Sequence, residues 1–152
     1  MATLYLTGFG PFGDVTTNPT MEIIEALKEE GKCTGEQCSA EFLNVVEVSA
    51  IGVDRYLADV QNAEGRRICI HLGVFQKSTQ FRVEKTAYNN MNFRIKDAQG
   101  FQPSNTCING ECQLDNPKDT QFNVAKAVSS LQEDGFDVVE SDDPGRYVYI
   151  QT

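Results

Sequence analysis

The sequence is poor in basic residues and contains a single histidine. It has 13 Lys and Arg against 22 Asp and Glu, which gives a formal net charge of -9 at pH 7. A field of this sign repels phosphate backbones and anionic lipid headgroups. We therefore expect neither nucleic acid nor a membrane surface among the partners.

The N-terminal stretch lacks the pattern of a secretory signal or a membrane span. The segment MATLYLTGFGPFG has no basic region ahead of its apolar run, and Thr7 and Gly8 interrupt that run early. Signal peptides carry such a basic region, and spanning helices need about 20 apolar residues. We expect a cytoplasmic protein.

The cysteines form an odd set, without the leader that would accompany a disulfide framework. They are Cys33, Cys38, Cys69, Cys107 and Cys112. The first two and the last two share a C-x4-C spacing, which is compatible with a four-thiolate zinc site. Structural zinc usually has tighter knuckles, however, and the two pairs lie far apart in the chain. We expect reduced thiols, no metal and no cofactor.

The hydrophobic pattern predicts an α/β protein. A length of 152 residues suits one globular domain, 1–152. The first half predicts a strand over 3–7, a helix over 19–30, a strand over 41–49, an amphipathic helix ending near Gly65, and a central strand over 66–74. This β-α-β-α-β series predicts an open three-layer α/β/α sandwich with a mostly parallel central sheet.

The second half is less regular. We predict a strand or extended arm over 79–90, a loop or hairpin over 97–118, a helix over 119–133 and a strand over 136–140. The segment SDDPG then has the composition of a helix start, and YVYIQT would form its first turns. Helices shorter than roughly 12–15 residues are marginal alone. We therefore expect a domain that is incomplete at its C-terminal end, with C-terminal elements missing.

The stretch GFGPFG at residues 8–13 matches the G-x-G-x-x-G pattern of a dinucleotide-binding turn. That fold needs a helix that begins within the motif and an acidic residue about 20 positions later. Here the predicted helix begins only at Pro19, and Pro11 has no backbone donor. Phe9 and Phe12 instead suggest the wall of a small apolar pocket, although this stretch alone favours the alternative of loop rings packed onto the core.

Several motifs occur in an order that identifies a family. They are TGFGPFG with NPT, HLGV at 71–74, VEKTAYN at 83–89, Arg94, and SDDPGRYV at 141–148. Together they resemble pyroglutamyl-peptidase I, a cysteine peptidase family that removes N-terminal pyroglutamate from peptides. The resemblance implies an α/β/α sandwich, a Cys-His-acid triad, and peptides with N-terminal pyroglutamate as partners.

The resemblance also assigns roles to four residues. Phe9 and Phe12 would flank the flat lactam ring, Glu84 would be the acid that orients the histidine, and Arg94 would help to stabilise the oxyanion. On residue type alone, a solvated strand glutamate is the favoured interpretation of Glu84, and the alternative for Arg94 is a surface ion-pair partner.

The resemblance fails at the nucleophile and its base. The family's cysteine follows the GRY run, where this sequence has Tyr149, and no cysteine occurs after Cys112. The family's histidine would lie beyond residue 152, and His71 in HLGV is expected to be a buried structural residue. Tyrosine, with an ordinary pKa near 10, is protonated at neutral pH and is a poor substitute.

Two hypotheses follow. In the first, the chain is a truncated or divergent family member, a pseudoenzyme that keeps Phe9, Phe12, Glu84 and Arg94 but does not turn over substrate. In the second, it is a noncatalytic binding or interaction protein on the same scaffold, recognising blocked N-termini or a protein partner.

Overall fold

The computed structural model describes residues 2–31, 34–35 and 38–147, with the backbone alone for 34–35 and 38–41. It divides into two compact units. The first unit comprises the chain up to Val74 together with Ile95–Gln102, and the second comprises Phe75–Arg94 and the chain from Pro103 onward. Each unit is described by itself below, and the expectation of one domain over 1–152 stays a prediction.

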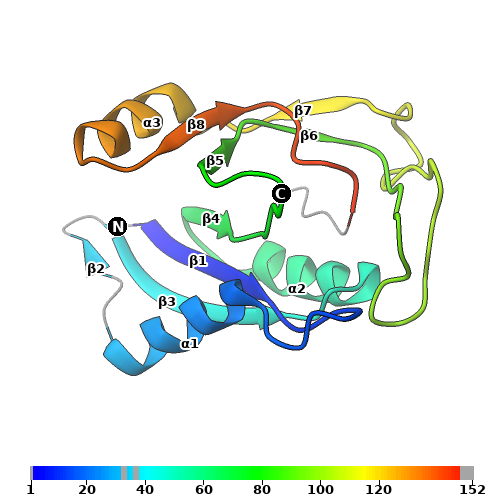
Figure 1. Ribbon diagram of the computed structural model, residues 1–152, viewed down its shortest axis with the longest axis horizontal. Coiled ribbons are helices and arrows are strands. Elements are labelled where there is room, and N and C mark those ends of the chain that lie inside the picture. Colours follow the sequence, from blue (N-terminus) through cyan, green and yellow to red (C-terminus); the bar gives the residue numbers. More distant parts are fainter. Residues whose placement is uncertain (1, 32–33, 36–37, 148–152) are drawn as a thin grey trace. The chain divides into compact units, whose positions relative to one another are not determined.

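The first unit is built on a four-stranded sheet. Its elements are β1 (Ala2–Phe9), α1 (Pro19–Glu30), β2 (Thr34–Gly35), β3 (Cys38–Val46), α2 (Ala50–Asn62) and β4 (Arg67–His71). The strand order is β2-β3-β1-β4, as Figure 1 shows. The central strand β1 runs parallel to β3 and to β4, whereas β2 is antiparallel to β3.

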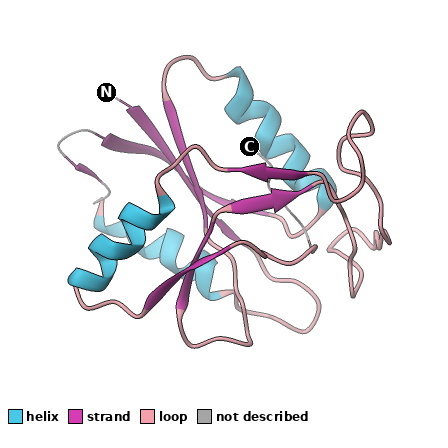
Figure 2. Cartoon of the chain, turned by 90° about the horizontal axis from the view of Figure 1, so that it is seen from above, coloured by secondary structure: helices cyan, strands magenta, loops and turns pink. Residues whose placement is uncertain are grey.

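The connections of this unit place helices on both faces of the sheet. The chain leaves β1 through α1 to reach β3 on one side, and it returns through α2 past β1 to β4. Because such crossovers are right-handed, two crossovers in opposite directions put their helices on opposite faces. Figure 2 shows helices on both sides of these strands. The predicted α/β/α sandwich with a mostly parallel sheet is confirmed.

Helix α1 has the bounds that the sequence predicts. The Asn18 side chain accepts a hydrogen bond from the backbone N–H of Thr20, Pro19 occupies the first helical position, and Gly31 ends the helix with φ 62°. Ile24 points into the core and is fully buried. A Cβ added at Gly8 of β1 would overlap the Thr20 carbonyl, so glycine lets β1 approach α1 closely.

The second unit holds two small two-stranded sheets and one helix. Its elements are β5 (Phe81–Glu84), β6 (Thr86–Tyr88), β7 (Pro117–Asp119), α3 (Val124–Glu133) and β8 (Val138–Ser141). Strand β5 pairs in parallel with β8, and β6 pairs antiparallel with β7. A core of Val124, Val128 and Val138, with Val83 against it, joins α3 to the β5–β8 pair.

The long connection from residue 89 to residue 116 has no helix or strand, as the loops of Figure 2 show. It includes much of the loop or hairpin predicted over 97–118. Asn89 organises part of it, because its Nδ2 lies 2.9–3.1 Å from the carbonyl oxygens of Asn109, Cys112 and Gln113. Its Oδ1 accepts a hydrogen bond from the Asn109 N–H at 2.7 Å.

Three expectations about elements are corrected. Strand β4 is not central: among the described residues it pairs with β1 alone, and Ile70 is 45% exposed. Helix α3 begins at Val124 rather than near 119, because residues 117–119 pair with β6 and Asn123 provides the cap. Residues 142–147 are not helical, and 148–152 lie outside the described residues.

The single histidine, His71, is half-buried in the first unit, and its expected structural role stays a prediction. Its Nδ1 lies 2.7 Å from Oγ1 of Thr7, which is fully buried, and the ring of Tyr56 lies edge-on at 6.2 Å. Burial lowers the pKa of His71 to about 4, which keeps the ring neutral at neutral pH. Burial also raises the pKa of the Cys69 thiol, two residues earlier on β4, so this pair is not an activated nucleophile and base.

The half-buried His71, held against Thr7, predicts a pH-dependent stability. Its pKa is about 4 in the folded state and about 6.5 in an unfolded chain, so the unfolded state binds more protons between these values. Stability is therefore full above the unfolded pKa and falls as the pH drops, by about 2 kcal/mol between about pH 7 and pH 5. Chemical denaturation of the wild type and of His71→Gln at both pH values measures this difference. The same pH dependence in both proteins would contradict a neutral, half-buried His71.

Candidate functional site

The carboxyl ends of the parallel strands define one edge of the first unit. Strand β1 ends at Phe9, β3 at Val46 and β4 at His71, and the register of the strands brings these ends to the same edge. In open α/β sheets ligands bind outside this edge, where the loops after the strands meet. The sequence-predicted residues Phe9 and Phe12 both lie there.

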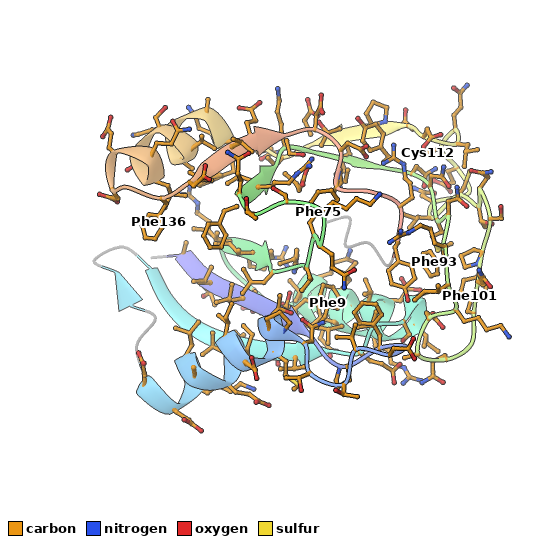
Figure 3. All side chains as sticks on the ribbon, viewed as in Figure 1. Phe9, Phe75, Phe93, Phe101, Cys112 and Phe136 are labelled. Atoms are coloured by element: carbon orange, nitrogen blue, oxygen red, sulfur yellow. The ribbon has the colours of Figure 1, made fainter. Side chains whose placement is uncertain are left out.

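The aromatic bend, residues 9–15, follows β1 directly. Phe9 and Phe12 are both half-buried, so neither residue is fully enclosed in the core. Phe12 and Val15 exchange two backbone hydrogen bonds, of 3.1 and 2.9 Å, across a tight turn in which Gly13 has φ +52°. Figure 3 labels Phe9 at the start of this bend.

Asn18 and Thr20 fix the bend to the start of α1. The Phe9 N–H donates to Thr20 Oγ1 at 2.9 Å, and that hydroxyl donates to Asn18 Oδ1 at 2.8 Å. Asn18 Nδ2 in turn donates to the carbonyl of Gly10 at 3.1 Å. Asn18 is 2% exposed, so this network is shielded from water. The NPT motif therefore acts as the anchor of the aromatic bend.

The geometry of the bend does not provide a phosphate cradle. The N–H groups of Phe9, Gly10 and Phe12 donate to Thr20, Val46 and Val15 respectively, at 2.9–3.1 Å. Pro11 has no N–H, and α1 begins at Pro19, after the glycine motif. Because a dinucleotide turn depends on free amides at a helix N-terminus, the nucleotide interpretation is not supported here.

A second segment of the first unit, residues 95–102, reaches the same edge. Ile95 Cδ1 would lie 3.6 Å from a Cβ at Gly13, and the buried Asp97 binds the start of α2. Its Oδ2 accepts from the Ala50 N–H at 3.0 Å, and its Oδ1 accepts from the N–H groups of Gln99 and Phe101, both at 2.9 Å. Sequence reasoning missed Asp97, because KDAQG shows only the composition of a turn.

Glu47 is a polar group at the same edge. Its carboxylate accepts from the Ser49 hydroxyl at 2.5 Å and from the Gln99 amide at 2.9 and 3.0 Å. The hydrogen bonds from Ser49 and then from Gln99 lower the pKa of Glu47. The carboxylate is thus ionised at neutral pH and joins the segment 95–102 to the end of β3.

Glu84, the predicted acid, lies at the end of β5 in the second unit. Its Oε1 accepts from Nε of Arg82 at 3.2 Å, and Arg82 also donates to Ser141 Oγ. Glu84 Oε2 is buried and has no hydrogen-bond partner among the described residues. One oxygen of the carboxylate is thus held and the other is left as an acceptor.

Arg94, the predicted oxyanion residue, is an exposed residue of the second unit. It follows the buried Phe93, whose N–H donates to the Pro103 carbonyl at 2.9 Å and whose ring packs edge-on against Tyr147 at 5.0 Å. Figure 3 labels Phe93. Glu84 and Arg94 belong to one unit, and Phe9 and Phe12 share the bend of the other.

Arg146 of the GRY motif contacts one aromatic ring and two carboxylates of the second unit. The Arg146 guanidinium lies 3.9 Å from the Tyr88 ring centroid, 3.2 Å from Asp115 Oδ1 and 2.8 Å from Asp143 Oδ1. Hydrogen bonds from Asn90 and from Arg146 lower the pKa of Asp115. Tyr149, which the sequence resemblance aligns with the family's cysteine, lies outside the described residues.

The described residues hold no group of three or more His, Cys, Asp or Glu side chains that could bind a metal. Cys69, Cys107 and Cys112 are free thiols. Cys33, of the first C-x4-C pair, lies outside the described residues.

None of the helices in the described part of the chain is long and apolar enough to cross a membrane.

Comparison with known proteins gives consistent matches. The model of the pyroglutamyl peptidase family matches residues 2–151. The pyrrolidone-carboxylate peptidase of Lacticaseibacillus paracasei is 30% identical over 146 residues, which cover 95% of this chain and 64% of that protein. The Bacillus subtilis pyrrolidone-carboxylate peptidase is 28% identical, with 94% of this chain and 64% of that protein covered. The chain thus spans less than two thirds of the length of both relatives.

Solved structures share the fold. The pyrrolidone carboxyl peptidase of Thermococcus litoralis superposes with a TM-score of 0.80 at 28% identity, covering 97% of this chain and 64% of that one. The pyrrolidone carboxyl peptidase of Fervidobacterium islandicum gives a TM-score of 0.85 at 24% identity, and the match covers 97% of this chain and 68% of that one.

The anchor of the aromatic bend yields a mutational prediction. Asn18→Ala removes a helix cap and also the donor to Gly10, so we expect a stability loss of about 1–3 kcal/mol. Asn123→Ala is the matched control, because Asn123 caps α3 through its hydrogen bond to the Lys126 N–H at 3.0 Å. We expect a smaller loss there. Chemical denaturation measures both losses, and an equal or greater loss in Asn123→Ala would contradict the anchoring role of Asn18.

Proposed function

The chain belongs to the pyroglutamyl peptidase family, and from this premise we propose that it recognises peptides whose N-terminus is blocked by pyroglutamate. The observation that carries the proposal is the aromatic bend. Two half-buried phenylalanines stand at the carboxyl edge of a parallel sheet, on a loop that Asn18 fixes through buried hydrogen bonds. This arrangement suits a small, rigid and uncharged ligand.

The chemistry of pyroglutamate fits such a bend. Its lactam ring is flat and neutral, so it gains from packing against aromatic faces and needs no countercharge. The net charge of the chain is -9, which opposes anionic ligands but not a neutral end group. We assign Phe9 and Phe12 to the two sides of the lactam ring.

Glu84 and Arg94 belong to the second unit, and their roles are assigned separately from those of the aromatic bend. We assign to Glu84 the task of orienting an imidazole, and its unpartnered Oε2 is consistent with an acceptor for an N–H group. We assign to Arg94 the stabilisation of negative charge on a carbonyl oxygen. The resemblance in the sequence implies that these roles serve a cysteine nucleophile, and it aligns Tyr149 of this chain with that cysteine. We therefore propose that these 152 residues bind such peptides without turning them over.

The cellular setting is part of the proposal. The free thiols Cys69, Cys107 and Cys112 are typical of a reducing compartment. We place the protein in the cytoplasm, with peptides rather than nucleic acid or membranes as its partners.

A peptide titration tests the recognition. We expect saturable binding of a pyroglutamyl peptide, measured by calorimetry, and a dissociation constant about fivefold or more higher in Phe9→Ala and in Phe12→Ala, since packing of the lactam against each aromatic ring is worth about 1 kcal/mol or more. Phe122→Ala, at a phenylalanine that is 60% exposed in the second unit, is the control. Equal affinity in the wild type and both bend variants would reject the assignment and favour an interaction protein with another partner.

A turnover assay tests the proposal that these residues do not hydrolyse the peptides they bind. With a fluorogenic pyroglutamyl substrate, we expect no release of the fluorophore above the rate without protein. Turnover that iodoacetamide abolishes would show that one of the five cysteines acts as a nucleophile, against this proposal.

A further inference from the structure

Arg82 lies next to Glu84 on one face of β5. Residues two apart on a strand point to the same side, and Arg82 Nε is 3.2 Å from Glu84 Oε1. Their side chains are 26% and 31% exposed, so the pair is partly withdrawn from water. The neighbouring Lys85 forms a different ion pair, with Glu140 at 3.5 Å.

The Arg82 guanidinium is held at three further points. It donates through Nη2 to Ser141 Oγ and to the Asp143 carbonyl, the latter at 3.3 Å, and it lies 4.6 Å from the Phe75 ring centroid. Phe75 is labelled in Figure 3. Ser141 is also the register partner of Glu84 across the β5–β8 pair. These contacts give the guanidinium one position and one orientation.

The Glu84 carboxylate is consequently asymmetric. Oε1 is taken by the guanidinium, whereas Oε2 is buried without a hydrogen-bond partner among the described residues. Buried polar atoms are nearly always paired, and an exception points to a ligand or a functional role. Arg82 decides which of the two oxygens is left for that role.

We propose that Arg82 is a positioning residue for Glu84. It fixes the carboxylate through Oε1 and so presents Oε2, in one direction, to an N–H donor. The inference rests on the proposed function, in which Glu84 orients an imidazole, and it adds a residue that sets the orientation of the acid itself.

The physical basis is pre-organisation. A glutamate side chain that is free to rotate loses conformational entropy when it accepts a hydrogen bond. A planar guanidinium with several N–H donors restricts the rotation of the carboxylate before the ligand binds. A lysine orients a carboxylate less specifically, because its ammonium is a point charge. The Arg82 guanidinium donates through Nε to the Glu84 carboxylate and through Nη2 to the hydroxyl of Ser141 in β8.

Imidazole is the probe that tests the proposal. In protein made with ¹³C-labelled glutamate, the Glu84 carboxyl signal is assigned by its loss in Glu84→Gln and is followed during an imidazole titration at about pH 8, where imidazole is neutral. We expect a saturable shift in the wild type and a dissociation constant several-fold higher in Arg82→Gln. Arg82→Lys should fall between them, which also decides the question if Arg82→Gln does not fold.

Lys85→Gln is the matched control, because it removes one positive charge from the same part of the chain without touching Glu84. We expect it to bind imidazole as the wild type does. A second signature is the Arg82 Nε–H proton, which should resonate downfield in the wild type and lose that shift in Glu84→Gln.

Two results would overturn the proposal: a Glu84 signal that imidazole does not move in the wild type, or equal dissociation constants in the wild type, Arg82→Lys and Arg82→Gln. No peptide is used here, so a failed peptide titration with the Phe9 and Phe12 variants would be a separate result.

Discussion

The buried amide of Asn18 joins two parts of the first unit, the start of α1 and the aromatic bend. Its Oδ1 caps α1 and accepts a hydrogen bond from the Thr20 hydroxyl, and its Nδ2 donates a hydrogen bond to the Gly10 carbonyl. Without this amide the Gly10 carbonyl would lose its buried donor, and the hydrogen bond from the Phe9 N–H to Thr20 would be left to join the bend to α1. Gly8 complements the amide by letting β1 and α1 approach each other. The positions of Phe9 and Phe12 depend on these contacts, and so does any use of their rings as a pocket wall.

Much of the first unit could be predicted from the sequence because its signals are local. Asn18 before Pro19 and Gly31 after the last turn predict both ends of α1, and the β-α-β-α-β order predicts the sandwich. Strand order is not a local property. The apolar run at residues 66–74 has the composition of an interior strand. In the described sheet, however, the interior strands are β3 and β1, and β4 lies at an edge. In the second unit, the pairing of β7 with β6 overrides the helical pattern near Asp119.

The candidate site could be predicted only in part, and for a physical reason. Phe9, Phe12, Glu84 and Arg94 lie in motifs that a sequence shows directly. Arg82 and Asp97 act through partners far away in the chain, Ser141 for the first and Ala50 for the second. No spacing rule connects such pairs, so their importance follows only from the folded geometry.

The central claim is that the aromatic bend walls a lactam site, and its most direct measurement is the contact between ligand and rings. In an NMR experiment on the protein with a bound pyroglutamyl peptide, isotope-filtered NOEs report which protein protons lie next to the lactam methylenes. The account predicts NOEs from the lactam ring to the ring protons of both Phe9 and Phe12. NOEs confined to aromatic rings of the second unit, such as Phe122 or Phe136, would contradict it.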